Sequence, residues 1–407
     1  MTEQDGRDAA VVNGLLEFVE KEVEPREEAI AEIMEEPRLL YTESGVEHPD
    51  VTAARTAVRM ASADAGYYQM FCPEEIGGGG LPLRLSVLCW EALHHKYGPG
   101  ERLAYGTISH WASGPSLLWT EVSEELAEQV RPKVVSGRLA GCFGMSEPEA
   151  GTDAWGMKTR ATRDGDSWSI TGSKQWTSFA PTADYVLLFA VTDPDMVAAR
   201  KGGITAFYVP METDGVRVES VIRLFGEIGG REAILSFDEA RVPDSYRFGP
   251  LHGGFNLAMM GASQGRLYNS ARSVGLARWA MERSVEYSQS RHTSGKPIAE
   301  HQSIQNMLAD MAVEIFAART MTLETAAKVD EGQDARRELA MAKLFATNAA
   351  VKIFDRAMQV HGGMGLTNEL RLHEGWKTAR TIRIADGTDE ILRRTIAKEL
   401  IRGNVRF

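Results

Sequence analysis

The stretch Gly141-Cys-Phe-Gly-Met-Ser-Glu-Pro-Glu-Ala-Gly-Thr-Asp153 marks a change of pattern within the 407-residue sequence. Before it, from residue 8 to about residue 131, apolar side chains recur at the spacing of amphipathic helices. A break at residues 73–82, where a run of glycines stands between two prolines, predicts a loop between helices. The quoted stretch therefore predicts the end of a helical region and the start of a different domain.

Short segments rich in β-branched and aromatic residues follow the quoted stretch, separated by turn residues. Val216 with Val218, and Leu235 with Phe237, show the alternation of a half-buried strand. Because no helical segment separates these strands, we expect a small antiparallel, barrel-like β domain rather than a doubly wound parallel sheet. The predicted strands are residues 168–171, 185–191, 205–209, 216–221 and 233–237.

The helical period returns after Gly253-Gly254 and continues toward the end of the sequence. Ile304, Met311 and Ile315 fall on one apolar stripe. Three breaks, at residues 295–297, 331–332 and 362–363, predict a bundle of about four helices, each of roughly 20 or more residues. We therefore expect an α+β protein with an N-terminal all-α domain (1–135), a middle β domain (136–248) and a C-terminal four-helix bundle (249–407).

The composition argues against several classes of protein. Lys and Arg number 45 against 57 Asp and Glu, a net charge of −12, which disfavours nucleic-acid binding. Neither a signal peptide nor an apolar stretch of about 18 residues is present, so we expect a cytoplasmic protein without a membrane span. The cysteines and histidines lack metal-ligand spacing, and no G-x-G-x-x-G follows a strand. A metal ion and a nicotinamide cofactor are therefore not expected.

Two segments combine glycines with small hydroxyl-bearing residues. Small residues such as Gly144, Gly151 and Thr152 let backbone N–H groups approach ring oxygens and phosphates closely. The stretch quoted first and a second one, Gly172-Ser-Lys-Gln-Trp-Thr-Ser178, together resemble the flavin-binding signature of the acyl-CoA dehydrogenase family. Further blocks that agree with this family in order and spacing are residues 72–80, 265–266, 290–302 and 359–365.

The resemblance implies FAD as the cofactor and assigns its contacts. Those implied in the β domain are Phe143, Met145 and Ser146 along the isoalloxazine ring, Gly151 and Thr152 at the pyrophosphate, and Trp176 and Ser178 over the ring and its N5 side.

The resemblance also implies that each FAD is shared between two subunits. Arg291 begins a polar turn, where a guanidinium can bind a phosphate with two hydrogen bonds. In this turn the sequence has Ser294 where the family usually has an aromatic residue, so one stacking contact is missing. We therefore expect a homodimer or homotetramer. The residues implied to touch the FAD of a partner are Arg291, Gln302, Gln359, Gly362 and Gly363.

The catalytic base implied by the resemblance is Asp386. Many family members place a glutamate before a Gly-Thr pair near the C-terminus, and here that position reads Asp386-Gly387-Thr388. A second location for the base in the family is occupied by Gly265, which has no side chain to serve. The aspartate resembles a branch of the family that uses this shorter acid. By the same resemblance Arg266 and Gly387 would contact the substrate and Thr388 the cofactor.

The function implied by the resemblance is α,β-desaturation of an acyl thioester. Asp386 would remove the α proton while a β hydride moves to flavin N5, and an electron-transfer flavoprotein would take up the electrons. Because aspartate is one methylene shorter than glutamate, we expect a branched, cyclic or hydroxylated acyl group, carried by CoA or by a carrier protein. The alternatives are a flavin oxidase resembling nitroalkane oxidases, and a non-catalytic family member that serves as a binding partner.

Overall fold

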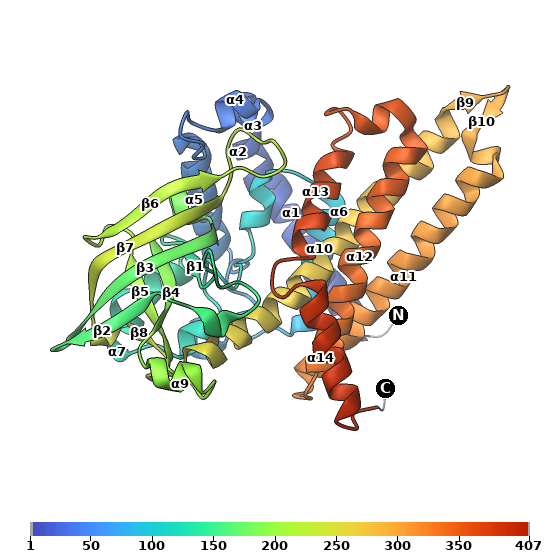
Figure 1. Cartoon of the computed structure of the whole chain (residues 1–407). Coiled ribbons are helices and arrows are strands. Elements are labelled where there is room, and N and C mark those ends of the chain that lie inside the picture. Colours follow the sequence, from blue (N-terminus) through green and yellow to red (C-terminus); the bar gives the residue numbers. More distant parts are fainter. Residues whose placement is uncertain (1–2, 406–407) are drawn as a thin grey trace. The chain divides into compact units, whose positions relative to one another are not determined.

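The computed structural model describes residues 3–405 (Figure 1). The chain forms two compact units, each assembled from segments that are far apart in the sequence. We name them the helical unit, which comprises Met1–Phe18, Leu81–Tyr105 and Ala262–Phe407, and the sheet unit, which comprises Val19–Gly80 and Gly106–Gly261. The three-domain division predicted from the sequence, with boundaries at residues 135 and 248, stays a prediction, because these two units group the chain by its internal contacts.

The sheet unit is built around an eight-stranded sheet. Its strands follow the order β6-β7-β3-β2-β4-β5-β8, and β1 pairs with β4 (Figure 1). All the predicted strands are confirmed within these elements. The strands of the sheet are β1 Gly141–Gly144, β2 Arg160–Asp164, β3 Ser167–Ser178, β4 Tyr185–Val191, β5 Ile204–Pro210, β6 Val216–Ile222, β7 Glu232–Pro243 and β8 Arg247–Phe248.

The sheet is mixed rather than purely antiparallel. β1 runs parallel to β4, with Gly141 opposite Tyr185, and one further parallel pair joins β2 to β4. About 40 residues, including the β2–β3 hairpin, connect β1 to β4, and a connection of this length permits parallel pairing. Sequence alternation reveals strands but not their direction, which explains the difference from the expected sheet.

Strand β4 is buried along its whole length and separates two hydrophobic clusters. Leu187 and Phe189 belong to one cluster, whereas Val186 and Leu188 belong to the other. Successive side chains of a strand point to opposite faces, so β4 contributes to a core on each face of the sheet. The first cluster also includes Leu126, which comes from a helix of the preceding region.

The region before residue 131 is helical, as predicted, and its helices divide between the two units. The predicted break at residues 73–82 is confirmed, since it contains only one short turn, Glu74–Ile76. A Cβ at Gly78 would lie 2.2 Å from the carbonyl oxygen of Cys72, so this loop requires glycine. The α-helices before the first strand are α1 Glu3–Phe18, α2 Glu24–Glu28, α3 Ala31–Glu35, α4 Pro37–Leu40, α5 Pro49–Asp64, α6 Leu83–Tyr97, α7 Glu124–Gln129 and α8 Arg131–Val135. A further short helix, α9 Pro194–Ala198, lies between β4 and β5.

The C-terminal region has three long helices followed by two shorter ones, in place of the four long helices expected. The predicted breaks are confirmed, and the first holds a hairpin of β9 (His292–Thr293) and β10 (Lys296–Pro297). The last segment is divided because Arg371, Asp386 and Gly387 have positive φ angles, which a right-handed helix excludes. The five helices are α10 Gly254–Ser290, α11 Gln302–Asp330, α12 Arg336–His361, α13 Leu372–Ile382 and α14 Asp389–Ile401.

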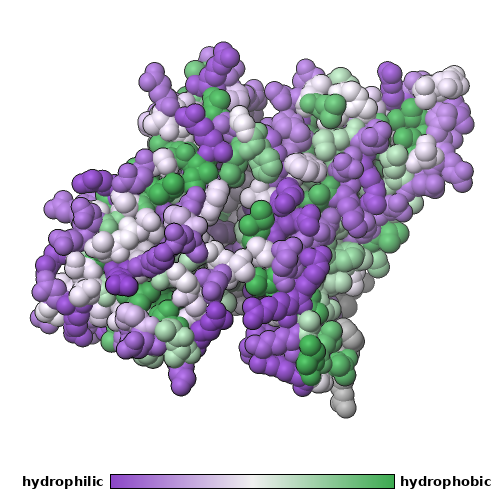
Figure 2. All heavy atoms as spheres, in the orientation of Figure 1, coloured by the Kyte–Doolittle hydropathy of each residue, from purple (hydrophilic) through white to green (hydrophobic). Residues whose placement is uncertain are grey.

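Hydrophilic residues cover most of the face drawn in Figure 2. Within residues 3–405 there is no helix whose length and apolar character would let it cross a membrane. Over the same part of the chain, no group of three or more His, Cys, Asp or Glu side chains is placed to hold a metal ion.

Candidate functional site

A buried ion pair fixes the turn that follows β1. The Lys174 ammonium lies 2.7 Å from Oε1 of Glu147 and donates to the carbonyl oxygen of Met145 at 3.1 Å. The Glu147 carboxylate also accepts from the backbone N–H groups of Lys158 and Thr159. Burial alone would raise the pKa of Glu147, but Lys174 and these hydrogen bonds outweigh burial and lower it. The turn is thus held by charge-assisted hydrogen bonds inside the sheet unit.

The predicted isoalloxazine contacts of the first segment lie on β1 and in this turn. Phe143, Met145 and Ser146 are half-buried. The Phe143 ring contacts the rings of Trp111 and Phe189, with centroids 5.0 Å and 4.8 Å away. The carbonyl oxygen of Ser146 accepts from the backbone N–H of Gln175 at 2.9 Å, which ties the turn to β3. The two segments that carry the flavin signature are therefore adjacent in the sheet unit.

The end of β3 presents Trp176 to solvent. The pairing of β3 with β7 shifts register between Lys174 and Thr177, and Trp176 lies in this irregularity with φ +64°. Trp176 is 52% exposed, which is high for a tryptophan. Ser178, two residues further along β3, is exposed as well. Thr177 points inward instead, and its buried Oγ1 has no hydrogen-bond partner among residues 3–405. A bound ring system would cover the exposed tryptophan.

Gly151 and Thr152 lie in an exposed loop of the sheet unit. A Cβ at Gly151 would meet no atom within 4 Å, and its φ is not in the left-handed region, so the fold itself does not require glycine there. Gly363, at the end of α12 in the helical unit, has the same property. Positions where glycine is unnecessary for the fold are suited to close approach of a bound group. The residues present thus fit the flavin and phosphate contacts predicted for them.

The helical unit holds Asp386 in a turn between α13 and α14. Asp386 has φ +52°, a region that aspartate tolerates better than most residues, and Gly387 follows with φ +102°. The Asp386 carboxylate accepts a hydrogen bond from Nδ2 of Asn269 at 2.7 Å, and its backbone carbonyl accepts from Nε of Arg266 at 3.3 Å. The fully buried Lys343 donates to the carbonyl oxygen of Gly387 at 2.8 Å. Three distant segments therefore meet at this turn.

The charge of Asp386 is set by opposing effects. Burial raises the pKa of the Asp386 carboxyl above its ordinary value, while Lys343, Arg272 and Arg266 act in the opposite direction. Burial also lowers the pKa of Lys343 to about 8. A carboxyl with a raised pKa beside hydrogen-bond donors has the character of a general base.

Sequence reasoning missed Asn269 and Lys343 as members of this cluster. Asn269 lies three residues after Arg266 on α10, so the two share a helix face, and a polar residue on a buried face was the available signal. Lys343 is a charged residue among alanines on the buried face of α12, and a charge on such a face was the available signal.

Thr388 and Asp389 have structural contacts in this unit. Oγ1 of Thr388 accepts from the backbone N–H of Ile391 at 3.4 Å and so caps α14. The buried Asp389 pairs with Arg383 at 2.6 Å and with Asn348 at 3.0 Å. The cofactor contact expected of Thr388 stays a prediction.

The residues predicted to serve a partner's FAD are exposed in the helical unit. Arg291 follows α10 beside the β9–β10 hairpin, and Gln302 is the first residue of α11. Gln359 lies in the last turn of α12, and Gly362 and Gly363 follow that helix. Across residues 3–405, no hydrogen bond engages the side chains of Arg291, Gln302 or Gln359, which leaves them available to another molecule.

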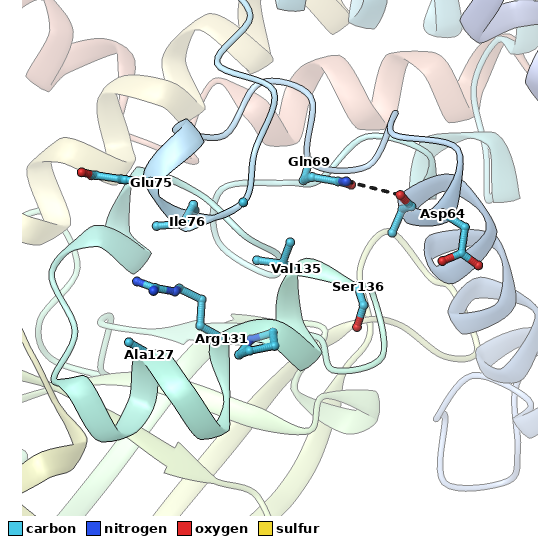
Figure 3. Close-up of a pocket in the computed structure, with 11 residues that line it drawn as sticks. Asp64, Gln69, Glu75, Ile76, Ala127, Arg131, Val135 and Ser136 are labelled. Atoms are coloured by element: carbon cyan, nitrogen blue, oxygen red, sulfur yellow. Dashed lines mark hydrogen bonds between the residues drawn. The ribbon is translucent and has the colours of Figure 1, made fainter.

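A hollow of about 480 Å³ lies elsewhere in the sheet unit (Figure 3). It is bordered by the end of α5, the loop around Glu75 and the helices α7 and α8. None of the residues predicted to bind cofactor or substrate lines it. The lining residues are Ala63, Asp64, Gln69, Glu75, Ile76, Gly77, Ala127, Arg131, Pro132, Val135 and Ser136.

Two family models match the chain. Residues 142–239 match the acyl-CoA dehydrogenase middle domain, and residues 252–401 match the acyl-CoA dehydrogenase C-terminal domain. The chain is 35% identical over 337 residues to the mitochondrial short-chain specific acyl-CoA dehydrogenase of Homo sapiens, covering 83% of this chain and 80% of the relative. It is 29% identical over 340 residues to the caffeyl-CoA reductase-Etf complex subunit CarC of Acetobacterium woodii, covering 84% and 88%.

The fold is also similar to a solved structure, that of butyryl-CoA dehydrogenase from Megasphaera elsdenii. The TM-score is 0.81 at 27% identity, and the match covers 99% of each chain. The similarity therefore extends over both units.

Proposed function

Because the chain belongs to the acyl-CoA dehydrogenase family, we propose that it desaturates an acyl thioester with Asp386 as the catalytic base. Members of this family are FAD-dependent oxidoreductases that act on the CH–CH group of acyl-CoA. When bound, FAD supplies the acceptor, at its N5 atom, for the hydride that leaves the β carbon. The remaining steps are carried by side chains of this protein.

The observation that carries the proposal is the surroundings of Asp386. Its carboxylate accepts a hydrogen bond from Asn269 and has three cations nearby, while burial raises its pKa. The hydrogen bond and the cations favour the ionised carboxylate, and the raised pKa increases the affinity of that carboxylate for a proton. A carboxylate balanced in this way can accept the α proton of a thioester and release it later.

The residues that would hold FAD belong to the predicted set. Ser146 and the backbone of its turn would contact the polar edge of the ring, and Trp176 and Ser178, which are exposed, would contact its face and N5 side. Gly151 and Thr152 offer backbone N–H groups to phosphate without side-chain bulk. Thr388 would touch the cofactor through the atoms that its capping role leaves free.

The assembly we propose is a homodimer or homotetramer, and tetramers are typical of the family. Arg291, Gln302 and the segment from Gln359 to Gly363 would contact the adenosine half of a partner's FAD. The free side chains of Arg291, Gln302 and Gln359 support this assignment. The family similarity covers these segments as well.

The substrate we propose is a branched, cyclic or hydroxylated acyl group on CoA or a carrier protein, contacted by Arg266 and Gly387. The shorter acid at position 386 leaves room above the α carbon that glutamate would fill. The electron acceptor we propose is an electron-transfer flavoprotein, because one relative is named as a subunit of a reductase-Etf complex.

Anaerobic titration of the FAD-loaded protein with a panel of acyl thioesters tests this proposal. We expect loss of flavin absorbance with branched, cyclic or hydroxylated acyl-CoA and formation of the 2-enoyl product. Fastest reduction by unbranched saturated chains would contradict the substrate class. Oxygen uptake with matching peroxide formation during turnover would point to an oxidase, and a protein that binds no FAD would point to a non-catalytic partner.

A further inference from the structure

Asn269 is a buried polar residue with only half of its amide in use. Its side chain is 2% exposed on α10. Nδ2 donates to Oδ2 of Asp386 at 2.7 Å, whereas the buried Oδ1 has no hydrogen-bond partner in the described part of the chain. A buried carbonyl oxygen without a partner is unfavourable, and an apolar side chain of the same size would avoid this loss. Packing alone therefore does not account for an amide at this position.

The charged groups around Asp386 cannot orient its carboxylate by themselves. Arg266 and Arg272 approach from α10 and Lys343 from α12, while Asp389 at the start of α14 is paired with Arg383. The hydrogen bonds of Arg266 and Lys343 go to backbone carbonyls of the Asp386–Gly387 turn, not to the carboxylate. Over residues 3–405, Asn269 makes the one hydrogen bond that reaches a carboxylate oxygen of Asp386.

We propose that Asn269 is the positioning residue of the catalytic base. It binds Oδ2 of Asp386, so that Oδ1 of the same carboxylate is left to accept the α proton of the substrate. A hydrogen bond from a fixed donor also favours the ionised carboxylate over the protonated acid. This inference rests on the proposed function, in which Asp386 is the base.

Two substitutions separate this role from a structural one. Asn269→Leu removes the donor and keeps the branched shape and the number of heavy atoms, and Asn269→Asp replaces the donor by a second carboxylate. Ser284→Ala is a matched control on the same helix, because the hydroxyl of the buried Ser284 donates to the carbonyl oxygen of Ala280, one turn earlier on α10 and away from Asp386 in the contacts of the described residues. The measurements are the pH dependence of flavin reduction under anaerobic conditions and the thermal midpoint.

We expect Asn269→Leu to increase the proton affinity of Asp386 about tenfold or more, which moves the acid limb of the pH profile of flavin reduction up by about one pH unit or more. Asn269→Asp should move it further, because two adjacent carboxylates oppose joint ionisation. The thermal midpoint of Asn269→Leu should stay close to that of the original protein, because the substitution removes the unpartnered Oδ1 of Asn269 while Oδ2 of Asp386 loses its donor. An unchanged acid limb, or a lower midpoint with the limb unchanged, would overturn the inference.

A second readout does not depend on turnover. Carbon-13 NMR of carboxyl-labelled aspartate in the FAD-free protein reports the titration of Asp386, whose signal is identified by its loss in Asp386→Asn. We expect the same upward shift in Asn269→Leu, and no shift would contradict the inference. If Asp386→Asn stays fully active, the proposed function itself fails. If Asp386→Asn is inactive and neither readout moves in Asn269→Leu, only the role of Asn269 fails.

Discussion

The turn after β1 in the sheet unit and the turn at Asp386 in the helical unit satisfy their polar groups in different ways. In the first, Lys174 and Glu147 form a buried pair whose remaining atoms bond to the backbone. In the second, Asn269 keeps an unpartnered oxygen and Asp386 has a raised pKa. The predicted cofactor turn is therefore held rigidly, whereas the surroundings of the predicted base keep a polar atom, Oδ1 of Asn269, without a partner among the described residues.

The largest expected effect is that of Asp386→Asn on turnover. The substitution keeps the shape and the tolerance for a positive φ but removes the proton acceptor. We expect the rate of flavin reduction by the best acyl thioester to fall by about 10²- to 10⁴-fold. Stopped-flow absorbance measures this rate, with FAD content checked in parallel. A variant that reduces its flavin at more than a tenth of the original rate would contradict Asp386 as the base.

Breaking the ion pair of the sheet unit should affect stability most. In Lys174→Met the Glu147 carboxylate stays buried without its cation, and we expect a loss of about 3–5 kcal/mol in the free energy of unfolding. Denaturant titration measures the loss. The double variant Lys174→Met with Glu147→Leu should regain part of it, because no buried charge is then left unpaired. Equal stability of the single variant and the original protein would show that the pair does not stabilise the turn.

Lys343→Gln tests the electrostatic balance at the base. The Lys343 cation favours the ionised form of Asp386, so its removal should raise the pKa of Asp386 and move the acid limb of the pH profile of flavin reduction upward by about one pH unit. The two profiles should converge above about pH 8, where Lys343 itself loses its proton. The readout is anaerobic flavin reduction over a pH series. A downward shift of the acid limb would contradict the claim that Lys343 favours the ionised form of Asp386.

The smallest expected effect is that of Gly151→Ala on the cofactor loop. The new methyl group meets no atom within 4 Å, so the stability of the FAD-free protein should change by less than about 0.5 kcal/mol. We expect the dissociation constant of FAD to rise by about five- to tenfold, because the methyl group obstructs approach of the pyrophosphate. Gly156→Ala, whose Cβ would lie 3.9 Å from Ala150, is the control from the same region. Titration with FAD distinguishes the two variants.

The strands and helix breaks could be predicted because they depend on local sequence. The alternation at Leu235 and Phe237 indicates a strand with one buried face, the continuous apolar run 185–191 indicates a fully buried strand, and glycine or proline at 295–297 stops a helix. The parallel pairing of β1 with β4 could not be predicted, since alternation is the same for either direction. The two short final helices also escaped prediction, because positive φ at Arg371 and Asp386 is a property of residues that need not be glycine.

The predicted flavin residues of the sheet unit were accessible to sequence reasoning because they lie in two continuous segments. Residues 141–153 and 172–178 are adjacent in the sheet unit, and between them they contain all of these predicted contacts. The exposed orientation of Trp176 was not accessible, since it depends on where β3 loses register with β7. The role of Thr388 as a helix cap follows from the position of α14 rather than from its motif.

Local residue patterns specified the succession of helical, strand and helical segments, and collinear motifs identified the family. The groups that surround Asp386 were visible only in the folded chain, because Asn269 is 117 residues away in sequence and Lys343 bonds to the turn from another helix. Periodicity records how a residue relates to its near neighbours in sequence. The proton affinity of a carboxyl depends on donors and charges within a few ångströms in space, and folding brings these together from distant segments.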